Sequence, residues 1–598
     1  MKAYPPIEID GRNLYYMFLA GANKIIENQS NLNKINVFPV PDGDTGTNMA
    51  STVRSVIDTL EPEHSYKSMA DSIAESTLIN ARGNSGIIFA QFLYGMSCET
   101  GEFHKVSLSH FIESIKSSVK YVYKAVSNPV EGTMLTIIRT WAEFIDANKA
   151  KFSDFNQLFL KSKSILEASL AETKTQLEVL RKADVVDAGA NAFFIFIQGM
   201  IELIKSKNIR SLISYDQSIA SFEELDEQIP EDVKFRYCTE GILKDISLEH
   251  EALSKILQQH GDSVVVAGAK KTSRIHVHTN NPALLFKELE NYGTITFQKA
   301  DDMVRQSEAV YKRKAKIALV TDSACDLPAG LFDEHQIHML PLNINFGENH
   351  YLDKVTIKSE QFYEKLKHDK DFPKTSQINE ISFRNLYSHL ASHYDAIIAV
   401  HLTEKFSGTF HSSVKAAAKV SKEFGKKIAV IDSRNISGAI GLIVLRIAQA
   451  IERGEEFDNV VEEAKNWVSE TKIFVSVKTL KYMVKGGRVS PLKGMLARLM
   501  NVKPIVSMDS EGKSEIFGKT YSQRSNMEKV IKHVKEISQS KKIWNYILLH
   551  ANNPEGASWF EKEMEAISSK KPVATVNISP VVAASAGIGA ASVALMYE

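Results

Sequence analysis

The segment Asn36–Asn48, which reads NVFPVPDGDTGTN, constrains the fold more than any other part of the chain. Its prolines, Pro39 and Pro41, fix φ and exclude a helix at this point. Asp42 and Asp44 then flank a glycine, and a tight turn there would bring both carboxylates to one point. Carboxylates with hydroxyl and amide neighbours suit Mg²⁺, which also binds phosphate oxygens.

An apolar, helix-forming stretch, Met49–Ile57, follows this loop directly. The loop therefore opens onto a helix N-terminus, where exposed N–H groups and the helix dipole attract anions. The alternative is an Asx-rich turn that only caps the helix. The spacing by itself leaves metal–nucleotide binding and simple capping equally open.

Composition restricts the class of protein only broadly. The chain has 598 residues, enough for three to five domains at about 150 residues each. Lys plus Arg equals Asp plus Glu at 72 each, so the charge balance favours neither nucleic acid nor an anionic membrane as a partner. The scattered cysteines, Cys98, Cys238 and Cys325, form no disulfide pattern, which indicates a cytoplasmic protein. We predict no signal peptide and no integral membrane segment, since no run of about 18 apolar residues occurs.

Residues 1–207 have apolar residues at helical spacing and read as a helical bundle or barrel with its chemistry in the loops. The predicted helical stretches are Leu14–Ile26, Ala50–Leu60, Ser68–Ala74, Ile87–Gly95, Leu108–Val126, Thr133–Ile145, Phe155–Leu180 and Ala190–Lys205. Three more glycine-containing loops each precede a helix: Asn80–Gly86 (NARGNSG), Glu131–Met134 (EGTM) and Asp184–Ala190 (DVVDAGA). Their N–H groups could hold phosphates, or Thr133 and Asp187 could simply cap helices.

The four loops together, DGDTGTNM, RGNSG, GTML and DAGA, resemble the DhaL family, the ATP-binding subunit of dihydroxyacetone kinases. They are most similar to the variant found in bacterial fatty acid kinases. The resemblance implies an all-α helical barrel that binds ATP and Mg²⁺ at one end, with Asp42 and Asp44 as catalytic metal ligands. Asn36 takes the place of a third carboxylate and is included among the metal ligands. The implied nucleotide contacts are Thr45, Thr47, Asn48, Asn84, Ser85, Gly86, Thr133 and Asp187.

Residues 208–312 change pattern and predict a small α/β domain. The expected strands are Phe235–Glu240, Ser263–Gly268, Arg274–Thr279 and Tyr292–Gln298, and the expected helices are Leu248–His260 and Ala283–Asn291. In a strand, His276 and His278 point to the same face, and Cys238 in another strand could complete a zinc site. The alternative is a surface histidine pair with a buried free cysteine. The stretches YCTE, GDS and HVHTN are similar to the middle domain of fatty acid kinases, which implies Zn²⁺ on these three residues.

Residues 315–598 follow a short basic linker and read as a second α/β domain. Buried strands are expected at the stretch beginning at Ile317 and at Ala396–Val400, Ile428–Ile431 and Ile473–Val477, with helices between them, which predicts a parallel sheet that binds ligands at its carboxyl edge. Hydroxyl-rich turns occur in VTDSACDLP, TSQ and SGTF. They could bind a carboxylate, or be ordinary turns and caps.

These turns, with a later IDS and GGR, resemble the DegV family of fatty-acid-binding proteins. The resemblance implies a fatty acid in a tunnel, with its carboxylate held by Thr375, by Ser407 and by a late histidine. That histidine is replaced here by Ser585, which can donate a hydrogen bond but carries no charge. The implied lipid contacts are Thr321, Ser323, Thr375, Ser407, Gly408, Thr409 and Ser585, and Arg488 matches an arginine implicated in docking to the kinase. A surface ion pair is the alternative role for Arg488.

The resemblances imply a fusion of a DhaL-type fatty acid kinase with a DegV-type acyl-binding domain. Such a chain would convert ATP and a bound fatty acid into acyl phosphate and ADP, for lipid metabolism. The expected partners are the fatty acid, a second copy of the chain in a homodimer, and a downstream acyltransferase. Two alternatives remain: a non-catalytic or regulatory lipid-binding protein, and a kinase of another small acid or hydroxy substrate, as in the glycerone kinases.

Overall fold

The computed structural model describes residues 7–38, 43–206, 233–269, 272–487 and 503–598. The predicted sites at Asp42 and Arg488 lie outside the described residues. The chain forms two compact units, Met1–Tyr311 and Lys312–Glu598. Because residues 207–232 are not described, the predicted boundary at 207 stays a prediction.

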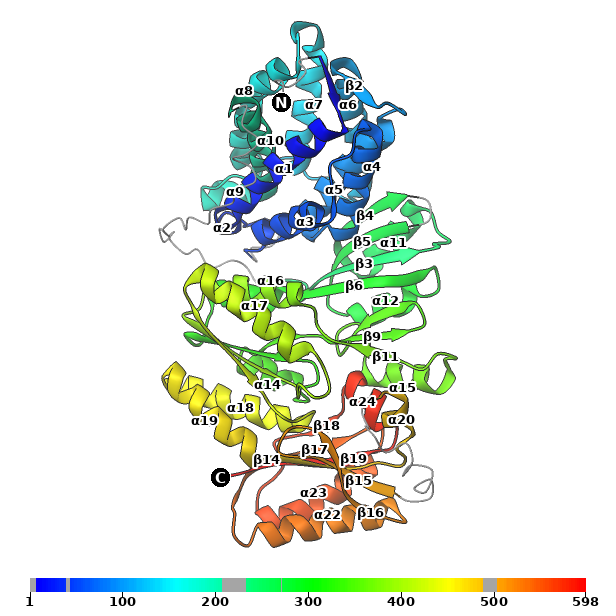
Figure 1. The fold of residues 1–598 in the computed structure, drawn as a ribbon, viewed down its shortest axis with the longest axis vertical. Helices are drawn as coiled ribbons and strands as arrows, with labels where there is room; N and C mark the ends of the chain where they lie inside the picture. Colours follow the sequence, from blue (N-terminus) through cyan, green and yellow to red (C-terminus); the bar gives the residue numbers. More distant parts are fainter. Residues whose placement is uncertain (1–6, 39–42, 207–232, 270–271, 488–502) are drawn as a thin grey trace. The chain divides into compact units, whose positions relative to one another are not determined.

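The first unit begins with a helical domain (Figure 1). Its helices are α1 (Gly11–Glu27), α2 (Gln29–Lys34), α3 (Thr45–Thr59), α4 (Tyr66–Asn80), α5 (Gly83–Glu99), α6 (Leu108–Ala125), α7 (Met134–Ala147), α8 (Phe155–Gln176), α9 (Glu178–Ala183) and α10 (Ala188–Ser206). Two short strands, β1 (Glu8–Asp10) and β2 (Lys105–Ser107), pair antiparallel. The helices share one core, whose edge-to-face aromatic rings include Phe92, Trp141 and Phe193. The predicted helical class of this region is therefore confirmed.

One predicted helix is divided into two in the structure. The apolar pattern over Phe155–Leu180 predicts a single helix, but α8 ends at Gln176 and α9 begins at Glu178. Leu177 between them has extended backbone, with φ −115° and ψ 126°. A helical period cannot reveal this break, because the apolar face resumes in register after it.

The helix α10 is long and apolar. By length and composition alone, Ala188–Lys205 could cross a bilayer, and it is the one such helix among the described residues. Of that window, 72% is buried within the fold, and α10 packs against α1, α7 and α8. This burial is what the central helix of a packed bundle requires.

The middle domain is a four-stranded antiparallel sheet in the order β4-β5-β3-β6. Its elements are β3 (Tyr237–Lys244), α11 (His250–His260), β4 (Gly261–Ala269), β5 (Thr272–Thr279), α12 (Pro282–Leu289), β6 (Thr294–Asp302) and α13 (Met303–Tyr311). One face of the sheet packs under α11 and α12 around an apolar cluster that includes Leu257, Ile275 and Phe286. The other face meets α5 and α6 of the helical domain, where Val265 and Ala267 join Ile87 and Ala90 in a second cluster.

The described residues of the second unit, 312–487 and 503–598, form three sheets. A parallel sheet has the order β13-β12-β7-β8, a small antiparallel sheet the order β10-β9-β11, and a mixed sheet the order β16-β15-β14-β19-β17-β18. The strands are β7 (Ile317–Asp322), β8 (His338–Leu340), β9 (Asn343–Phe346), β10 (Asn349–Leu352), β11 (Lys374–Ser376), β12 (Ala396–His401), β13 (Lys427–Asp432), β14 (Thr471–Ser476), β15 (Lys503–Met508), β16 (Ser514–Thr520), β17 (Ile543–His550), β18 (Thr575–Asn577) and β19 (Ala591–Tyr597).

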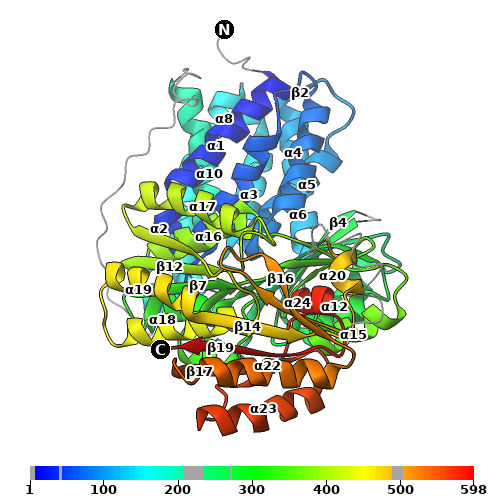
Figure 2. The same ribbon diagram turned by 60° about the horizontal axis from the view of Figure 1, so that its bottom comes forward.

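Helices cover these sheets and separate two of them. They are α14 (Ala329–Glu334), α15 (Ser359–His368), α16 (Glu380–Ala391), α17 (Thr409–Phe424), α18 (Gly438–Glu452), α19 (Phe457–Glu470), α20 (Lys481–Lys485), α22 (Gln523–Ile537), α23 (Pro554–Ser568) and α24 (Pro580–Ala586). The almost wholly buried α18 contacts strands of both the parallel and the mixed sheet. The helices α22 and α23 lie side by side against the mixed sheet (Figure 2). The predicted α/β class is confirmed.

One predicted strand pairs with its neighbours in a different direction from the one that the sequence predicts. The buried run Ile473–Val477 predicts a parallel strand, but β14 pairs antiparallel with β15 and β19 in the mixed sheet. Helices α18 and α22 both contact β14. A strand that is covered on both faces has the same continuous apolar pattern whatever the direction of its neighbours.

Candidate functional site

The loops predicted to bind the nucleotide precede α3, α5, α7 and α10, and contacts between them show that these helix N-termini converge. At the start of α5, a Cβ on Gly83 would lie 2.6 Å from Asn48 Nδ2, and one on Gly86 would lie 2.7 Å from Thr52 Oγ1. Gly83 also has φ +63°, which favours glycine. The first turns of α5 and α3 therefore touch, at a distance that larger residues would not allow.

The starts of α10 and α7 meet α5 in the same way. A Cβ on Gly189 would lie 2.8 Å from Ser85 Oγ and 3.6 Å from Met134 Cβ. Asp187 accepts the backbone N–H of Ala190 at 2.6 Å and also that of Met134. Four helix N-termini thus converge, and their aligned dipoles and free N–H groups favour a polyanionic ligand.

The metal loop is buried where it is described. Asn36 is 3% and Asp44 8% exposed, and the hydroxyl of Thr45 donates a hydrogen bond to the amide oxygen of Asn36. Asp44 stands at the N-cap of α3, but its side chain caps no N–H of that helix. The capping alternative therefore does not account for Asp44. Its metal-binding role, and that of Asp42, stay predictions.

The structure gives the other predicted nucleotide residues different surroundings. The Thr47 hydroxyl accepts hydrogen bonds from Asn33 Nδ2 at 2.9 Å and Gln29 Nε2 at 3.3 Å, so α2 engages it. By contrast, the amide oxygen of Asn84 is buried with no hydrogen-bond partner among the described residues. A buried acceptor of this kind is costly. Its position in the loop therefore fits a bound ligand, metal or water.

Thr133 and Asp187 act as helix caps, as the simpler interpretation expects. The Thr133 hydroxyl accepts the Leu135 N–H at 3.4 Å, and Asp187 accepts that of Ala190. Burial raises the pKa of Asp187 to about 7, although backbone N–H donors at Ala190, Met134 and Gly189 oppose the shift. Capping and nucleotide contact are not exclusive, because a cap at this convergence also orders the N–H groups around it.

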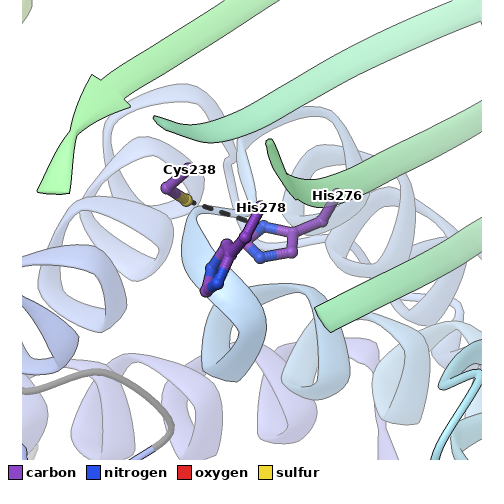
Figure 3. A group of neighbouring side chains, drawn as sticks. All are labelled: Cys238, His276 and His278. Atoms are coloured by element: carbon purple, nitrogen blue, oxygen red, sulfur yellow. Dashed lines mark hydrogen bonds between the residues drawn. The ribbon is translucent and has the colours of Figure 1, made fainter. Parts of the chain in front are cut away.

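Cys238, His276 and His278 form one buried cluster between β3 and β5 (Figure 3). Their ligand atoms all lie within 4.8 Å of one another, and Cys238 Sγ lies 3.8 Å from His276 Nδ1. Strand register places Cys238 directly opposite His278. We call these three residues the metal triad. The surface-pair alternative is wrong, since both histidines are buried.

The chemistry of the metal triad fits Zn²⁺. Burial lowers the pKa of His276 to about 3 and that of His278 to about 4, so both imidazoles are neutral and able to act as ligands at neutral pH. His276 Nε2 is buried with no hydrogen-bond partner among the described residues. Burial raises the pKa of the Cys238 thiol, and a metal would be needed to bind it as thiolate.

In the second unit, a pocket brings together the polar side chains that the sequence predicts to hold a carboxylate. Thr375 at β11, Ser407 before α17 and Ser585 on α24 all line it. The wall is mostly apolar and includes Ile473 and Val475 from β14. An elongated ligand with one polar end suits such a lining.

Sequence reasoning missed His550, which ends β17 and lines the same pocket. Its Nδ1 accepts the Asn553 N–H at 3.3 Å, so the neutral ring carries its proton on Nε2 and can donate it. Partial burial lowers the pKa of His550. The available signal was a histidine at the carboxyl end of a buried apolar strand, where α/β proteins place ligands.

The other four predicted lipid contacts do not line the pocket. Thr321 donates to the Val400 carbonyl at 2.9 Å, and Ser323 accepts the Leu342 N–H at 3.0 Å. Thr409 shares a hydrogen bond of 2.8 Å with Ser407. Together with Gly408, which precedes α17, these residues support the wall behind the pocket. Their contact with lipid stays a prediction.

A buried Ser–His–Asp arrangement lies nearby. His401 Nε2 is 2.9 Å from Ser413 Oγ, and His401 Nδ1 is 3.1 Å from Asp322 Oδ2. All three residues are 0% exposed, and the Tyr387 hydroxyl lies 2.6 Å from Ser413 Oγ. A nucleophile must be reachable by substrate. This network instead fastens the ends of β7 and β12 to α17, and so holds the loop that carries Ser407.

Sequence models of three families match separate stretches of the chain. A DAK2 domain matches residues 39–202, the FakA-like middle domain of fatty acid kinases matches residues 234–310, and the DegV family of uncharacterised proteins matches residues 316–598. The DAK2 match includes Asp42 and Asp44, and the middle-domain match includes the whole metal triad.

Curated relatives match about half of the chain. Protein YloV of Bacillus subtilis is 29% identical over 52% of this chain and 58% of its own length. The MG369 homolog of Mycoplasma pneumoniae is 33% identical over 52% of this chain and 60% of its own length. This chain thus spans less than two thirds of either relative.

Solved structures of DegV family proteins match about half of the chain. A fatty-acid-binding DegV family protein from Thermus thermophilus is 26% identical, with a TM-score of 0.44, and covers 47% of this chain and all of its own. The fatty acid binding protein DegV of Bacillus subtilis is 27% identical, with a TM-score of 0.43, and covers 48% of this chain and all of its own.

Proposed function

Because this chain joins a DAK2 domain, a FakA-like middle domain of fatty acid kinases and a DegV-family domain in one polypeptide, we propose that it is a fatty acid kinase that carries its own acyl-binding domain. A carboxylate oxygen of the fatty acid attacks the γ-phosphorus of ATP. The bond from that phosphorus to the β–γ bridging oxygen breaks, and ADP leaves with the electron pair. The products are acyl phosphate and ADP.

The convergence of four helix N-termini carries this proposal. Such a convergence suits a nucleotide triphosphate better than any neutral ligand. In the same chain, a separate apolar pocket presents hydroxyls at one place. One polypeptide therefore offers both a polyanion site and a site for an amphiphilic acid.

In the nucleotide half, the chain's residues bind and orient phosphates. The N–H groups at the starts of α5 and α7 would donate to phosphate oxygens, with Ser85 and Thr133 beside them. Asp44, with Asp42 and Asn36, would hold Mg²⁺, which neutralises phosphate charge when bound. Asn84 Oδ1, which the described protein leaves without a partner, would accept from water or face the metal.

In the lipid half, Thr375, Ser407 and Ser585 would donate to the acyl carboxylate, and the apolar wall would hold the chain and exclude water. The His550 Nε2–H adds a further donor to this pocket. A carboxylic acid with a pKa of about 4 to 5, by analogy with Asp and Glu, is already ionised at neutral pH. The reaction therefore needs no general base.

The metal triad would hold Zn²⁺, which would tie β3 to β5 and stabilise the middle domain. We assign it no part in phosphoryl transfer. The acyl phosphate is a reactive mixed anhydride, so an acyltransferase is the class of enzyme that would consume it. With three free cysteines, we place the protein in the cytoplasm.

Transfer in a homodimer, from one copy's nucleotide site to the other copy's lipid site, has a direct test. At fatty acid concentrations well below saturation, the Asp44→Asn and Ser407→Ala variants would each be weak alone. If transfer crosses between copies, mixing them restores activity to about a quarter of wild type, on the assumption of random exchange. If the mixture shows only the sum of the two weak activities, phosphoryl transfer stays within one chain.

A regulatory lipid-binding protein is the second candidate. It is favoured by Ser585, which gives the pocket a neutral donor at the place where the resemblance expects a histidine. In that case lipid would bind but turn over slowly or not at all. A kinase of a small hydroxy substrate would instead phosphorylate glycerone and ignore fatty acids.

The deciding experiment traps acyl phosphate with hydroxylamine. Purified chain, Mg²⁺, ATP and a panel of fatty acids would be incubated, and the hydroxamate measured. We expect product with the chain alone and none without Mg²⁺. Co-purified lipid without hydroxamate would refute the kinase and leave the binding protein, while ATP use with glycerone would point to the third candidate.

A further inference from the structure

The sheet face that carries the metal triad also carries a buried ion pair. Cys238 and Glu240 are two residues apart on β3, and Arg274 and His276 are two apart on β5, so all four point to one face. Strand register pairs Glu240 with His276. The ion pair and the triad are therefore immediate neighbours.

This ion pair is fully enclosed. Glu240 is 0% and Arg274 3% exposed, and their Oε2 and Nη2 atoms lie 2.5 Å apart. Lys299 adds its Nζ at 3.8 Å from Glu240 Oε1. Buried charges are tolerated only where hydrogen bonds satisfy their remaining atoms. Here those bonds come from the helical domain.

Glu240 and Arg274 hold the junction between α4 and α5. Glu240 Oε1 accepts the backbone N–H of Gly83, the first residue of α5, at 2.7 Å. Arg274 donates to the Ile79 carbonyl at 2.7 Å and to the Ala81 carbonyl. The buried Glu240–Arg274 pair of the middle domain thus hydrogen-bonds to both ends of the short connection between α4 and α5.

That connection is the predicted phosphate loop. Gly83 has positive φ and touches Asn48, so its peptide orientation is restricted. The N–H groups of Asn84 and Ser85 follow directly. A bond that fixes Gly83 therefore also fixes the direction in which these donors point.

We propose that Glu240 and Arg274 position the nucleotide loop at the start of α5, and that metal binding at the triad and nucleotide binding are linked through this pair. The inference rests on the proposed nucleotide site and deepens it, because it gives the middle domain a role in ATP affinity. Neither residue touches the reacting atoms, so both are positioning residues.

The linkage has a physical basis in the charges. A divalent cation on Cys238 and His276 places positive charge beside Glu240 and orders the strand positions on either side of it. The nucleotide loop is ordered by the same carboxylate. Linkage is reciprocal, so if metal tightens nucleotide binding by some factor, nucleotide tightens metal binding by the same factor.

The test measures binding in the full chain. The affinity for an Mg²⁺–non-hydrolysable ATP analogue is measured by calorimetry in zinc-loaded and in chelator-stripped protein. Zinc affinity is measured by chelator competition with and without the analogue. Glu240→Gln is compared with Asp302→Asn, which removes a carboxylate from the Arg236–Asp302 ion pair within the same domain.

We expect zinc to tighten nucleotide binding at least fivefold in wild type, and nucleotide to tighten zinc binding by the same factor. Glu240→Gln should weaken nucleotide binding about tenfold and reduce the linkage factor to one, while Asp302→Asn behaves as wild type. Arg274→Lys should resemble Glu240→Gln, because lysine keeps the charge but lacks the planar fork that reaches two carbonyls. A merely structural pair would lower both affinities without changing the linkage factor.

Equal nucleotide affinity with and without zinc in wild type would overturn the linkage. Glu240→Gln and Asp302→Asn within twofold of each other would overturn the positioning role. If thermal unfolding shows that Glu240→Gln does not fold, Glu240→Asp and Arg274→Lys carry the same comparison. Linkage without hydroxamate formation would refute the kinase and keep this inference, whereas a wild-type chain that binds no Mg²⁺–nucleotide overturns both.

Discussion

The proposed nucleotide site of the helical domain and the proposed lipid pocket of the second unit would bind their ligands in opposite ways. The first gathers backbone N–H groups and carboxylates from four loops, each a few residues long. The second encloses an apolar space whose wall comes from segments more than 200 residues apart, such as Thr375 and Ser585. A polyanion is held by directed charge, and an acyl chain by excluded water.

From this difference we expect the two sites to respond differently to substitution. At the proposed nucleotide site we expect a lost carboxylate to have no substitute, because charged groups stabilise a phosphoryl group through directed contacts. In the lipid pocket, several hydroxyls and one imidazole line the same space. The loss of one donor there leaves others in reach.

The largest effect should come from Asp44→Asn. Losing one carboxylate of the metal loop should lower acyl phosphate formation about 100-fold or more, the size expected when a group that stabilises the transferring phosphoryl is lost. Co-purified fatty acid, measured by mass spectrometry, should stay at the wild-type level. The variant Asp42→Ala should show the same loss of acyl phosphate formation. Loss of co-purified fatty acid in either variant would refute the proposal that nucleotide and lipid bind at separate sites.

Asp353→Asn should stabilise the second unit at neutral pH. Burial raises the pKa of Asp353 to about 7, above the unfolded value near 4, so its folded-state proton favours folding at low pH and this benefit is lost as pH rises through 7. Asparagine keeps an acceptor for the Val581 N–H. Above pH 7 the variant should gain about 2 kcal/mol over wild type in denaturant unfolding. A gain that grows as pH falls would contradict this sign.

Ser407→Ala should weaken fatty acid binding about tenfold, or about 1.5 kcal/mol, the loss of one hydrogen bond to a charged group. Nucleotide affinity should not change. Ser592→Ala, which removes another hydroxyl that lines the pocket, is the matched control and should change binding little. Equal losses of fatty acid affinity in both variants would indicate that the carboxylate does not bind at Ser407.

His550→Gln should have the smallest effect, about threefold in fatty acid affinity, because glutamine keeps an N–H donor. The informative quantity is pH dependence. Below the lowered pKa of His550 the ring is charged and should attract a carboxylate, so wild-type affinity should rise there until the fatty acid itself protonates. If the variant shows the same pH dependence of fatty acid affinity as wild type, His550 does not contact the carboxylate.

The sequence located site residues most accurately where a site is built from consecutive residues. The loop around Asp44 and the strand carrying His276 and His278 could be located from spacing alone, because turn and strand geometry fix local directions. The strand direction of Ile473–Val477 was wrong, since burial on both faces hides it. Nothing in the sequence groups His550 with Ser585, because the two are close only after folding.

By itself, the sequence predicted the helical and the α/β stretches and the shared face of His276 and His278, which follow from local periodicity and alternation. The order of domain types and the assignment of Zn²⁺ to the metal triad are what the family resemblance implies. Only the tertiary structure decided that Glu240 would hold the Gly83 N–H across 157 residues of chain, and that Asp44 would not cap its own helix. The partner of a buried charged residue depends on which surfaces bury it. Those surfaces come together only when the chain folds and its domains pack.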